Sequence, residues 1–272
     1  SSLLISIKAD LIDREIFQIL QQVCTEIGFD RAAIFEIDNE TKSSVLVNEW
    51  TDKSIAPYRK NDKPFIYDLS DWFYMQLEMS DFVVIEDVNS LPIEAFKEID
   101  HWKDAKINSL LAVPMYSHGK LYGYLQFDSL QKKNIPDKDT IQLVRHLAGI
   151  FANAIERKKN KQALKSSKQQ YKDLFSNLTS GYIIFDVIRD KKGNPIDFVY
   201  ENVNPSFEEI TGIKRKKIIN KKLREVFPEF GNLWYEKAKK ISLQKRKIYF
   251  QQYVPYLKKD FDVTGLWTEN DK

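Results

Sequence analysis

The sequence has a single cysteine, Cys24, among 272 residues. It therefore cannot form an internal disulfide bond or a cysteine cluster that binds a metal. A chain without disulfides suits a reducing compartment, so we expect a cytoplasmic location. Uncharged apolar stretches are also short, Leu110–Met115 being typical, whereas a spanning helix needs about 20 apolar residues. We therefore expect no membrane span and, from the same scarcity near the N-terminus, no signal peptide.

Histidine is almost as scarce. The three histidines are His101, His118 and His146, and neither histidine nor cysteine occurs after His146. The second half of the chain therefore cannot hold a histidine-ligated haem or a flavin that forms a cysteine adduct. Cys24 alternates with core positions of a predicted helix, which favours a small buried residue over a bilin attachment site. No histidine spacing resembles a metal-ligand pair, so we expect no metal and leave the cofactor open.

Motifs of catalysis are missing too. We find no phosphate-binding loop, glycine-rich ATP lid or kinase signature, and no acidic pair is set apart as an acid–base pair. We therefore expect no catalytic residues and no enzymatic activity in this chain.

The small net charge of +3 hides an asymmetry. Residues 1–157 carry 17 basic and 25 acidic residues, and residues 158–272 carry 25 basic and 14 acidic residues. A reversal at one point suggests two units with different surfaces. The basic half could contact nucleic acid, but no nucleic-acid motif accompanies it. The favoured interpretation is a solvated surface or a face for an acidic neighbour, without nucleic acid.

The first half alternates between helical and strand patterns. Apolar spacing predicts a helix over Leu11–Ile27 that Gly28 ends, and Ser70 or Asp71 begins another up to Met79. A further helix is predicted over Ile93–Trp102. Strands are predicted at Ala32–Ile37, Ser44–Trp50, Phe82–Ile85, Leu110–Tyr116 and Leu121–Phe127. Ser117–Lys120 contains a glycine that permits a tight hairpin between the last two strands.

A long helix is predicted from Asp137 onward. A seam along it follows alternating spacings of four and three: Leu143, Leu147, Ile150, Ala154, Arg157, Lys161, Leu164, Lys168, Tyr171, Phe175 and Leu178. The ends of this seam are apolar, and its middle is polar at Arg157, Lys161 and Lys168. Such a heptad seam is typical of a coiled coil. The favoured interpretation is one continuous helix that joins two domains and pairs with its own copy in a parallel homodimer. The alternative is two helices with a break near Lys158–Asn160.

The second half returns to strands after Leu178. Strands are predicted at Gly181–Ile188, Ile196–Val203, Lys247–Tyr256 and Phe261–Trp267, and helices at Asn204–Gly212, Lys214–Ile219 and Leu233–Leu243. Asn204 is positioned to cap the helix that Pro205 opens.

Both halves resemble known families. Leu91-Pro92, Ile107–Met115 and Gly119–Ser129, followed by the closing helix, stand in the order of a GAF domain. Tyr171–Leu178, Gly181–Asp186, Gly193–Tyr200, the segment Asn204-Pro205-Ser-Phe207 to Thr211-Gly212, and Val226–Glu229 resemble a PAS domain. A PAS sheet has five strands with the last in the middle, and only four are counted. Either the sheet lacks its last strand, or two strands have been merged.

These resemblances imply an α/β (α+β) chain of two domains, each an antiparallel sheet flanked by helices. The expected boundaries are 1–157 for the GAF-like sensor domain, 158–170 for the helical linker and 171–272 for the PAS-like domain. Such pairs occur in bacterial and archaeal sensor histidine kinases and related signalling proteins. The implied function is a non-catalytic sensor of a small molecule, coupled to an output domain such as a histidine kinase or diguanylate cyclase. The alternatives are an enzyme with a GAF- or PAS-like pocket and a ligand-free dimerisation adaptor.

Ligands of these families bind between the sheet and its helices. Aromatic residues that could line such pockets are Trp50, Tyr58, Trp72 and Phe73 in the first half, and Phe185, Tyr200, Asn202 and Trp234 in the second, where Asn202 adds a polar group. For each of them the alternative is ordinary core packing.

Overall fold

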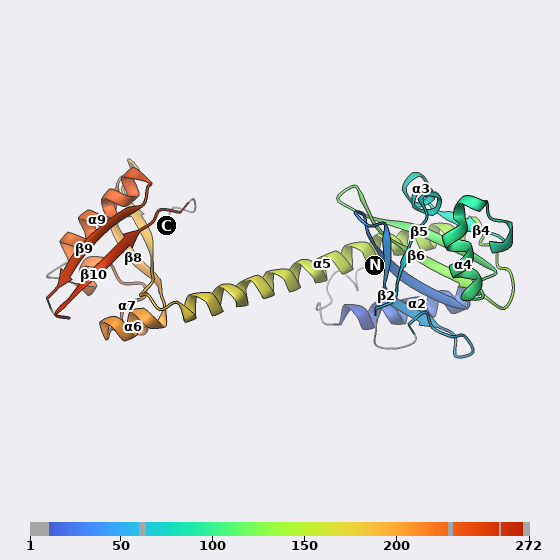
Figure 1. The fold of residues 1–272 in the computed structure, drawn as a ribbon, viewed down its shortest axis with the longest axis horizontal. Helices are drawn as coiled ribbons and strands as arrows, with labels where there is room; N and C mark the ends of the chain where they lie inside the picture. The colour runs from blue at the N-terminus through green and yellow to red at the C-terminus, as the bar shows by residue number, and fades with distance from the viewer. Residues whose placement is uncertain (1–10, 60–63, 228–230, 256, 269–272) are drawn as a thin grey trace. The chain divides into compact units, whose positions relative to one another are not determined.

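The chain divides into two compact units, residues 1–164 and 165–272. The computed structural model describes residues 11–59, 64–227, 231–255 and 257–268. One helix, α5 (Lys138–Asn177), belongs in part to each unit (Figure 1).

The first unit is built on one antiparallel sheet of six strands. These are β1 (Arg31–Asp38), β2 (Ser43–Thr51), β3 (Ile66–Asp68), β4 (Val83–Ile85), β5 (Ser109–Ser117) and β6 (Lys120–Ser129). Their order is β3-β2-β1-β6-β5-β4, and every neighbouring pair is antiparallel. The antiparallel sheet predicted for this half is therefore confirmed. The sequence missed β3 because three residues are too few to show an alternating pattern.

Helices cover both faces of this sheet. On one face α2 (Ile12–Ile27) and α5 pack against the sheet through Ile16, Leu20 and Phe151. On the other face lie α3 (Asp71–Met79), α4 (Phe96–Asp104) and the short 3₁₀ turns Val88–Ser90 and Ile93–Ala95, with Phe73 and Trp102 buried. Since side chains of a strand alternate between faces, two separate cores share one sheet.

Several predicted local signals hold. Gly28 ends α2 in the left-handed conformation, with φ 73°. Ser70 caps α3 by accepting a hydrogen bond from the amide of Phe73 at 3.1 Å. His118 and Gly119 both have positive φ, 49° and 76°, as a two-residue turn of the hairpin β5–β6 requires. The hairpin predicted from Ser117–Lys120 is thereby confirmed.

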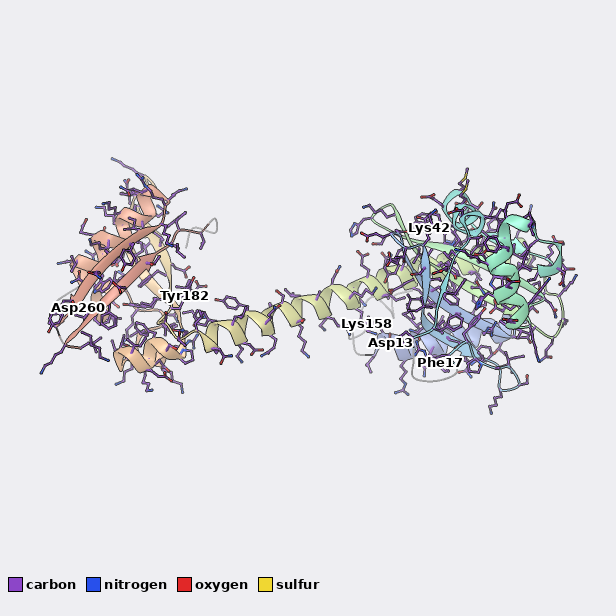
Figure 2. All side chains as sticks on the ribbon, in the orientation of Figure 1. Asp13, Phe17, Lys42, Lys158, Tyr182 and Asp260 are labelled. Carbon is purple, nitrogen blue, oxygen red and sulfur yellow. The ribbon has the colours of Figure 1, made fainter. Side chains whose placement is uncertain are left out.

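Helix α5 runs for 40 residues without a break at 158–160, so the alternative of two helices is wrong. Its buried stripe in the first unit is Val144, Ala148, Phe151, Ala152 and Ile155. The heptad seam is offset from this stripe: in the first unit Ala154 is its one buried member, and Leu147 and Ile150 are partly buried at the edge of the core. Lys158 of α5 pairs with Asp13 of α2 (Figure 2). Seam residues Leu164 and Tyr171 are more than half exposed.

The second unit contains β7 (Ile183–Arg189), β8 (Pro195–Val203), β9 (Ile248–Val254) and β10 (Lys259–Gly265). Between β8 and β9 come α6 (Pro205–Thr211), α7 (Arg215–Ile218), α8 (Leu223–Val226) and α9 (Gly231–Gln244). Asn204 caps α6 as predicted, because its Oδ1 accepts the amide of Phe207 at 3.0 Å. Phe198, Tyr200 and Phe207 form the core with residues of α7 and α8.

The prediction of one sheet in this unit needs correction. The four strands pair only as β7–β8 and β9–β10, which gives two separate two-stranded sheets among the described residues. A fifth strand of a PAS sheet would lie between β7 and β10 and join the two small sheets. No strand of the described part pairs with both β7 and β10. The Pro228-Glu229 motif and Tyr256 lie outside the described residues. None of the helices described here has the length and apolarity needed to cross a membrane.

Candidate functional site

The richest polar chemistry of the first unit lies between the sheet and helix α4. We call this region the inner site and define it by eight residues: Arg31, Tyr58, Tyr67, Glu98, His101, Trp102, Gln126 and Asp128. Strands β1, β3 and β6, the segment after β2 and one face of α4 supply them. Glu98, His101 and Trp102 share that face because they are three and four residues apart on one helix.

An ion pair anchors the inner site. Arg31 and Asp128 are direct partners across β1 and β6, so their side chains leave the same face of the sheet. Arg31 Nε donates to Asp128 Oδ2 at 2.7 Å, and the two side chains are only 2% and 0% exposed. Burial is the largest single effect and lowers the pKa of Arg31, but the charge of Asp128 and smaller effects of Tyr58, of the hydrogen bond to Asp128 and of Glu49 together outweigh burial, and the net direction is upward. The guanidinium is therefore held charged inside the unit.

Tyr58 and Gln126 complete the surroundings of this carboxylate. The Tyr58 hydroxyl donates to Asp128 Oδ2 at 2.8 Å, and Gln126 Nε2 donates to Asp128 Oδ1 at 2.6 Å. Gln126 Nε2 also lies 3.0 Å from the Tyr58 hydroxyl. The guanidinium of Arg31 stacks on Tyr58, 3.5 Å from its ring centroid. Burial raises the pKa of the Tyr58 phenol, so this ring stays neutral and keeps its proton to donate.

Five buried polar atoms of the inner site have no hydrogen-bond partner among the described residues. They are Arg31 Nη2, Glu98 Oε2, His101 Nε2, Trp102 Nε1 and Gln126 Oε1. An unsatisfied buried polar group costs about 1–3 kcal/mol, and a cluster of them in one place indicates bound water or a ligand. Arg31, Glu98, Trp102 and Gln126 are each at least nine-tenths buried. The site therefore contains unpartnered hydrogen-bond donors and acceptors that could bind water or a small polar molecule.

Aromatic rings form the walls. The imidazole of His101 stacks on Tyr67, with centroids 4.2 Å apart and planes at 16°. It also stacks on Tyr58, at 5.7 Å and 15°. Burial lowers the pKa of His101 to about 4, although the charge of Asp128 opposes the shift and that of Arg31 adds to it. His101 is therefore neutral at pH 7.

Glu98 is the second acidic residue of the inner site. Its Oε1 accepts the amide of Ser70 at 2.7 Å, and its side chain is fully buried. Burial raises the pKa of this carboxyl, while the hydrogen bonds from Ser70 act in the opposite direction. Nearby, the hydroxyls of Tyr67 and Tyr124 are hydrogen-bonded to each other, and Tyr124 contacts Ser44 Oγ at 2.8 Å.

The residues predicted to line a pocket fall on different faces. Tyr58 belongs to the inner site, and Phe73 and Trp72 pack in the same core cluster. Trp50 lies on the opposite face of the sheet, in the core beneath α2 and α5. The structure therefore brings together three of the four candidates.

Sequence reasoning missed seven residues of the inner site. A partial signal was present, because Gln126 and Asp128 interrupt an otherwise apolar strand next to a glycine-bearing hairpin. Glu98, His101 and Trp102 also have helical spacing, but nothing in the sequence shows which face of α4 meets the sheet. Cys24 is buried in the other core, and burial raises its pKa, so it is a core thiol as predicted.

In the second unit the four candidates separate as well. Phe185 and Tyr200 contact each other, with centroids 4.6 Å apart, and Trp234 packs at the edge of the same core. Asn202 does not join them, because the register of β7 and β8 shifts between Ile184 and Phe185 and Val203 takes the core position. The Oδ1 of Asn202 instead accepts Arg215 Nε at 3.1 Å.

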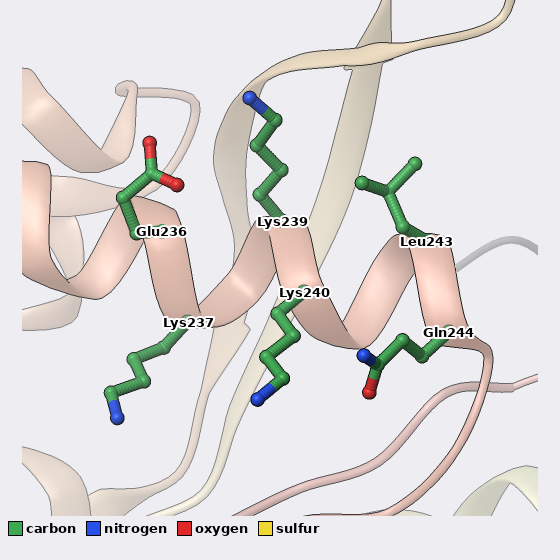
Figure 3. A pocket seen from close by; sticks show the side chains of 6 residues that line it. All are labelled: Glu236, Lys237, Lys239, Lys240, Leu243 and Gln244. Carbon is green, nitrogen blue, oxygen red and sulfur yellow. The ribbon is translucent and has the colours of Figure 1, made fainter.

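A surface hollow lies on α9 in this unit. Six residues of one helix line it, three of them lysines: Glu236, Lys237, Lys239, Lys240, Leu243 and Gln244 (Figure 3). A hollow lined by one helix alone has no opposing wall, so it does not enclose a ligand. Among the described residues, no group of three histidine, cysteine or acidic side chains is placed to hold a metal ion.

Comparison with solved structures finds similar folds at low identity. The blue-light-absorbing form of the Thermosynechococcus elongatus PixJ GAF domain is 16% identical, with 61% of this chain and 98% of that chain covered and a TM-score of 0.48. The chromophore-binding domain of Stigmatella aurantiaca bacteriophytochrome is 13% identical, with 57% of each chain covered and a TM-score of 0.45. Neither likeness indicates what this chain binds. No curated protein matches the chain.

The family comparison is decisive for the first unit. Residues 12–155 match the GAF domain, which is more than half of the 272 residues and spans the sheet, the inner site and the packed part of α5. This chain therefore belongs to the GAF domain family.

Proposed function

We propose that this chain is a non-catalytic sensory module in which the GAF unit binds a small molecule at the inner site. The observation that carries the proposal is the group of five unpartnered, buried polar atoms set among aromatic rings. A purely structural core has no need of so many unsatisfied groups, since replacing them by apolar side chains would cost less. A ligand that satisfies them would gain hydrogen bonds in a region of low dielectric constant.

The sheet offers a route from the inner site to α5. Neighbouring residues of one strand face opposite cores: Phe35 and Tyr124 face the inner site, whereas Ile34 and Leu125 pack beneath α2 and α5. A ligand that binds one arrangement of the strands more tightly shifts the population toward it. Because protein cores are densely packed, the opposite face must accommodate the change, and α5 is part of that face.

The response is proposed to continue through α5 to a PAS-like second unit and an output domain outside this chain. The second unit supports this with its capped helix after β8, where Asn204, Phe207 and Gly212 stand as the resemblance implies. We further propose that two copies pair in parallel along α5. The exposed seam residues Leu164, Tyr171 and Leu178 support pairing, because solvent-exposed apolar residues at heptad spacing favour a second helix.

Catalysis is not part of the proposal, because neither the one thiol nor the buried histidine is set up to react. The one thiol of the chain is buried in the other core with a raised pKa, so it is not a ready nucleophile. His101 is neutral, but its ring stacks on tyrosines and no hydroxyl nucleophile donates to it among the described contacts. The groups of the inner site are arranged to hold a ligand.

The test combines native mass spectrometry with a thermal-shift screen of metabolites on the full chain. Ligands of the inner site should stabilise the wild type and lose affinity in Gln126→Leu, which removes the unpartnered Oε1. The matched control is Gln22→Leu, an exposed glutamine on α2, which should bind as the wild type does. Failure of every compound class to bind would contradict the sensor proposal and favour an adaptor, and turnover of a bound compound would favour an enzyme.

A further inference from the structure

The imidazole of His101 occupies a layered space inside the inner site. It stacks on Tyr67 at 4.2 Å and on Tyr58 at 5.7 Å, with both planes within 16° of its own. Phe65 contacts it at 5.4 Å with a tilt of 44°. The guanidinium of Arg31 lies on the Tyr58 ring in turn, 3.5 Å from the centroid. The imidazole therefore stacks on two phenols, one of which also contacts the guanidinium, and a flat ring is what this space holds.

The charges of the inner site restrict the net charge that a ligand ring can carry. The positive charge of Arg31 is already balanced by Asp128, and both are buried. Asp104 lies farther out on α4 and is exposed. Burial also disfavours the charged form of Glu98, the other acidic residue of the inner site, and raises its pKa. An ion added beside the balanced Arg31–Asp128 pair would lose its hydration, which is unfavourable without a free counter-charge. The resident imidazole shows the same preference, because burial lowers the pKa of His101 to about 4 and keeps the ring neutral.

Two residues beside the stacked rings carry an unpartnered donor and an unpartnered acceptor. Arg31 Nη2 is a donor and Gln126 Oε1 is an acceptor, and neither is satisfied by the imidazole. The two residues come from adjacent strands and both contact Tyr58 and Asp128. A ring with a neighbouring N–H and C=O, the lactam edge of many nitrogen heterocycles, presents the matching acceptor and donor. Trp102 Nε1 and Glu98 Oε2 remain for further polar groups of a larger ring.

We propose that the His101 side chain fills the ligand space of the inner site in this structure. The ligand is a neutral, planar nitrogen heterocycle with a lactam edge, and it takes the place of the imidazole between Tyr58 and Tyr67. The inference rests on the proposed sensory function, of which it names the ligand class. Helix α4 carries His101, so ligand entry moves the imidazole out and displaces the side chain or the helix. Two hydrogen bonds at about 1 kcal/mol each should favour a lactam ring over a ring without one by roughly 10- to 30-fold.

The experiment opens the space with His101→Ala in the full chain and probes it at pH 7.5 by thermal shift and calorimetry. The compound 4-methylimidazole, which mimics the deleted side chain, should stabilise His101→Ala and leave the wild type unchanged. The matched control is His118→Ala, which removes an imidazole that is 87% exposed and should bind nothing. Of two rings of equal size, 2-pyridone should bind His101→Ala roughly 10-fold or more tightly than pyridine does. Adding Gln126→Leu, which removes one of the two expected hydrogen bonds and leaves Arg31 in place, should reduce that preference to about 5-fold.

Two results would overturn the inference. Toluene is the apolar probe. If toluene and 4-methylimidazole stabilise His101→Ala equally, the space left by the imidazole is an ordinary apolar core. If His101→Ala binds 2-pyridone and pyridine with equal affinity, the site does not recognise a lactam edge.

A measurement on the wild type covers the case in which His101→Ala does not fold. The chain has only three histidines, so its imidazole C–H signals are few enough to follow by NMR. Saturating 2-pyridone should shift the His101 signal as that ring leaves the stack, while the His118 signal stays in place. If another compound from the metabolite screen binds the inner site and 2-pyridone does not, the ligand class is wrong and the sensory function stands.

Discussion

The buried ion pair Arg31–Asp128 makes the stability of the GAF unit depend on one carboxylate. Replacing Asp128 by Asn keeps the shape and removes the charge, which leaves the guanidinium of Arg31 buried without its partner. Asp128 also accepts hydrogen bonds from Tyr58 and Gln126. The amide of Asn has only one acceptor oxygen, so at least one of these donors loses its acceptor.

The expected loss is large. Removing one partner of a buried ion pair costs about 3–5 kcal/mol, against a total stability of about 5–15 kcal/mol for a typical domain. The matched control is Asp71→Asn, which breaks the pair between Lys42 and Asp71 at the surface, where the two side chains are 44% and 81% exposed. Exposed pairs contribute little to stability, and salt screens them further. Asp128→Asn should therefore lower the free energy of unfolding far more than Asp71→Asn does.

Urea denaturation followed by tryptophan fluorescence measures the difference. The chain has five tryptophans, of which Trp50, Trp72 and Trp102 report on the first unit. Placing all variants in a background of Trp234→Phe and Trp267→Phe confines the signal to that unit. The double variant Arg31→Gln/Asp128→Asn should recover part of the loss, since no uncompensated charge remains.

A loss below about 1 kcal/mol for Asp128→Asn, equal to that of Asp71→Asn, would refute the reasoning. Strong weakening of the Asp128 effect by salt would do the same, because a pair sealed from solvent is screened little.

Four further predictions follow from single contacts. The pKa of His101 falls from an ordinary 6.5 to about 4 in the folded chain. The contribution of the neutral imidazole to stability is therefore present above pH 6.5 and is lost as the pH falls toward 4. At about 1.4 kcal/mol per pH unit, the loss amounts to at most about 3 kcal/mol. Urea titrations at pH 4.5 and 7 should show it in the wild type and not in His101→Gln. Asn204→Ala should destabilise the second unit by about 1–3 kcal/mol, because the amides of Phe207 and Tyr182 both lose their acceptor; Trp234 fluorescence monitors this, and an unchanged midpoint would contradict it. Leu164→Glu, on the heptad seam, should dissociate the proposed dimer in sedimentation at tens of micromolar. Leu174→Glu, also more than half exposed but off the seam, should not, and a monomeric wild type would exclude the pairing. The purified chain should be colourless, and a haem, flavin or bilin absorption band that survives dialysis would show that expectation to be wrong.

Local chemistry determined most of the elements. Gly28, Ser70 and Asn204 act on their own backbone neighbours, so their capping roles could be predicted from the sequence and are found in the structure. The hairpin β5–β6 follows from the turn at His118 and Gly119 for the same reason. The unbroken α5 also follows from a sequence with no proline or glycine between Gly149 and Asn177. Such signals involve residues close in the chain, and no tertiary contact overrides them.

The inner site was decided by the tertiary structure. Arg31 and Asp128 are 97 positions apart, and only the antiparallel pairing of β1 with β6 makes them partners. The side of α4 that meets the sheet depends on how that helix packs, so Glu98, His101 and Trp102 had no distinguishing pattern in the sequence. Trp50 shows the converse, because strand alternation turned an aromatic candidate toward the opposite core. The sequence determines which segments form strands and helices. Which side chains meet inside is set by strand pairing and helix packing between distant segments, and these long-range contacts created the site.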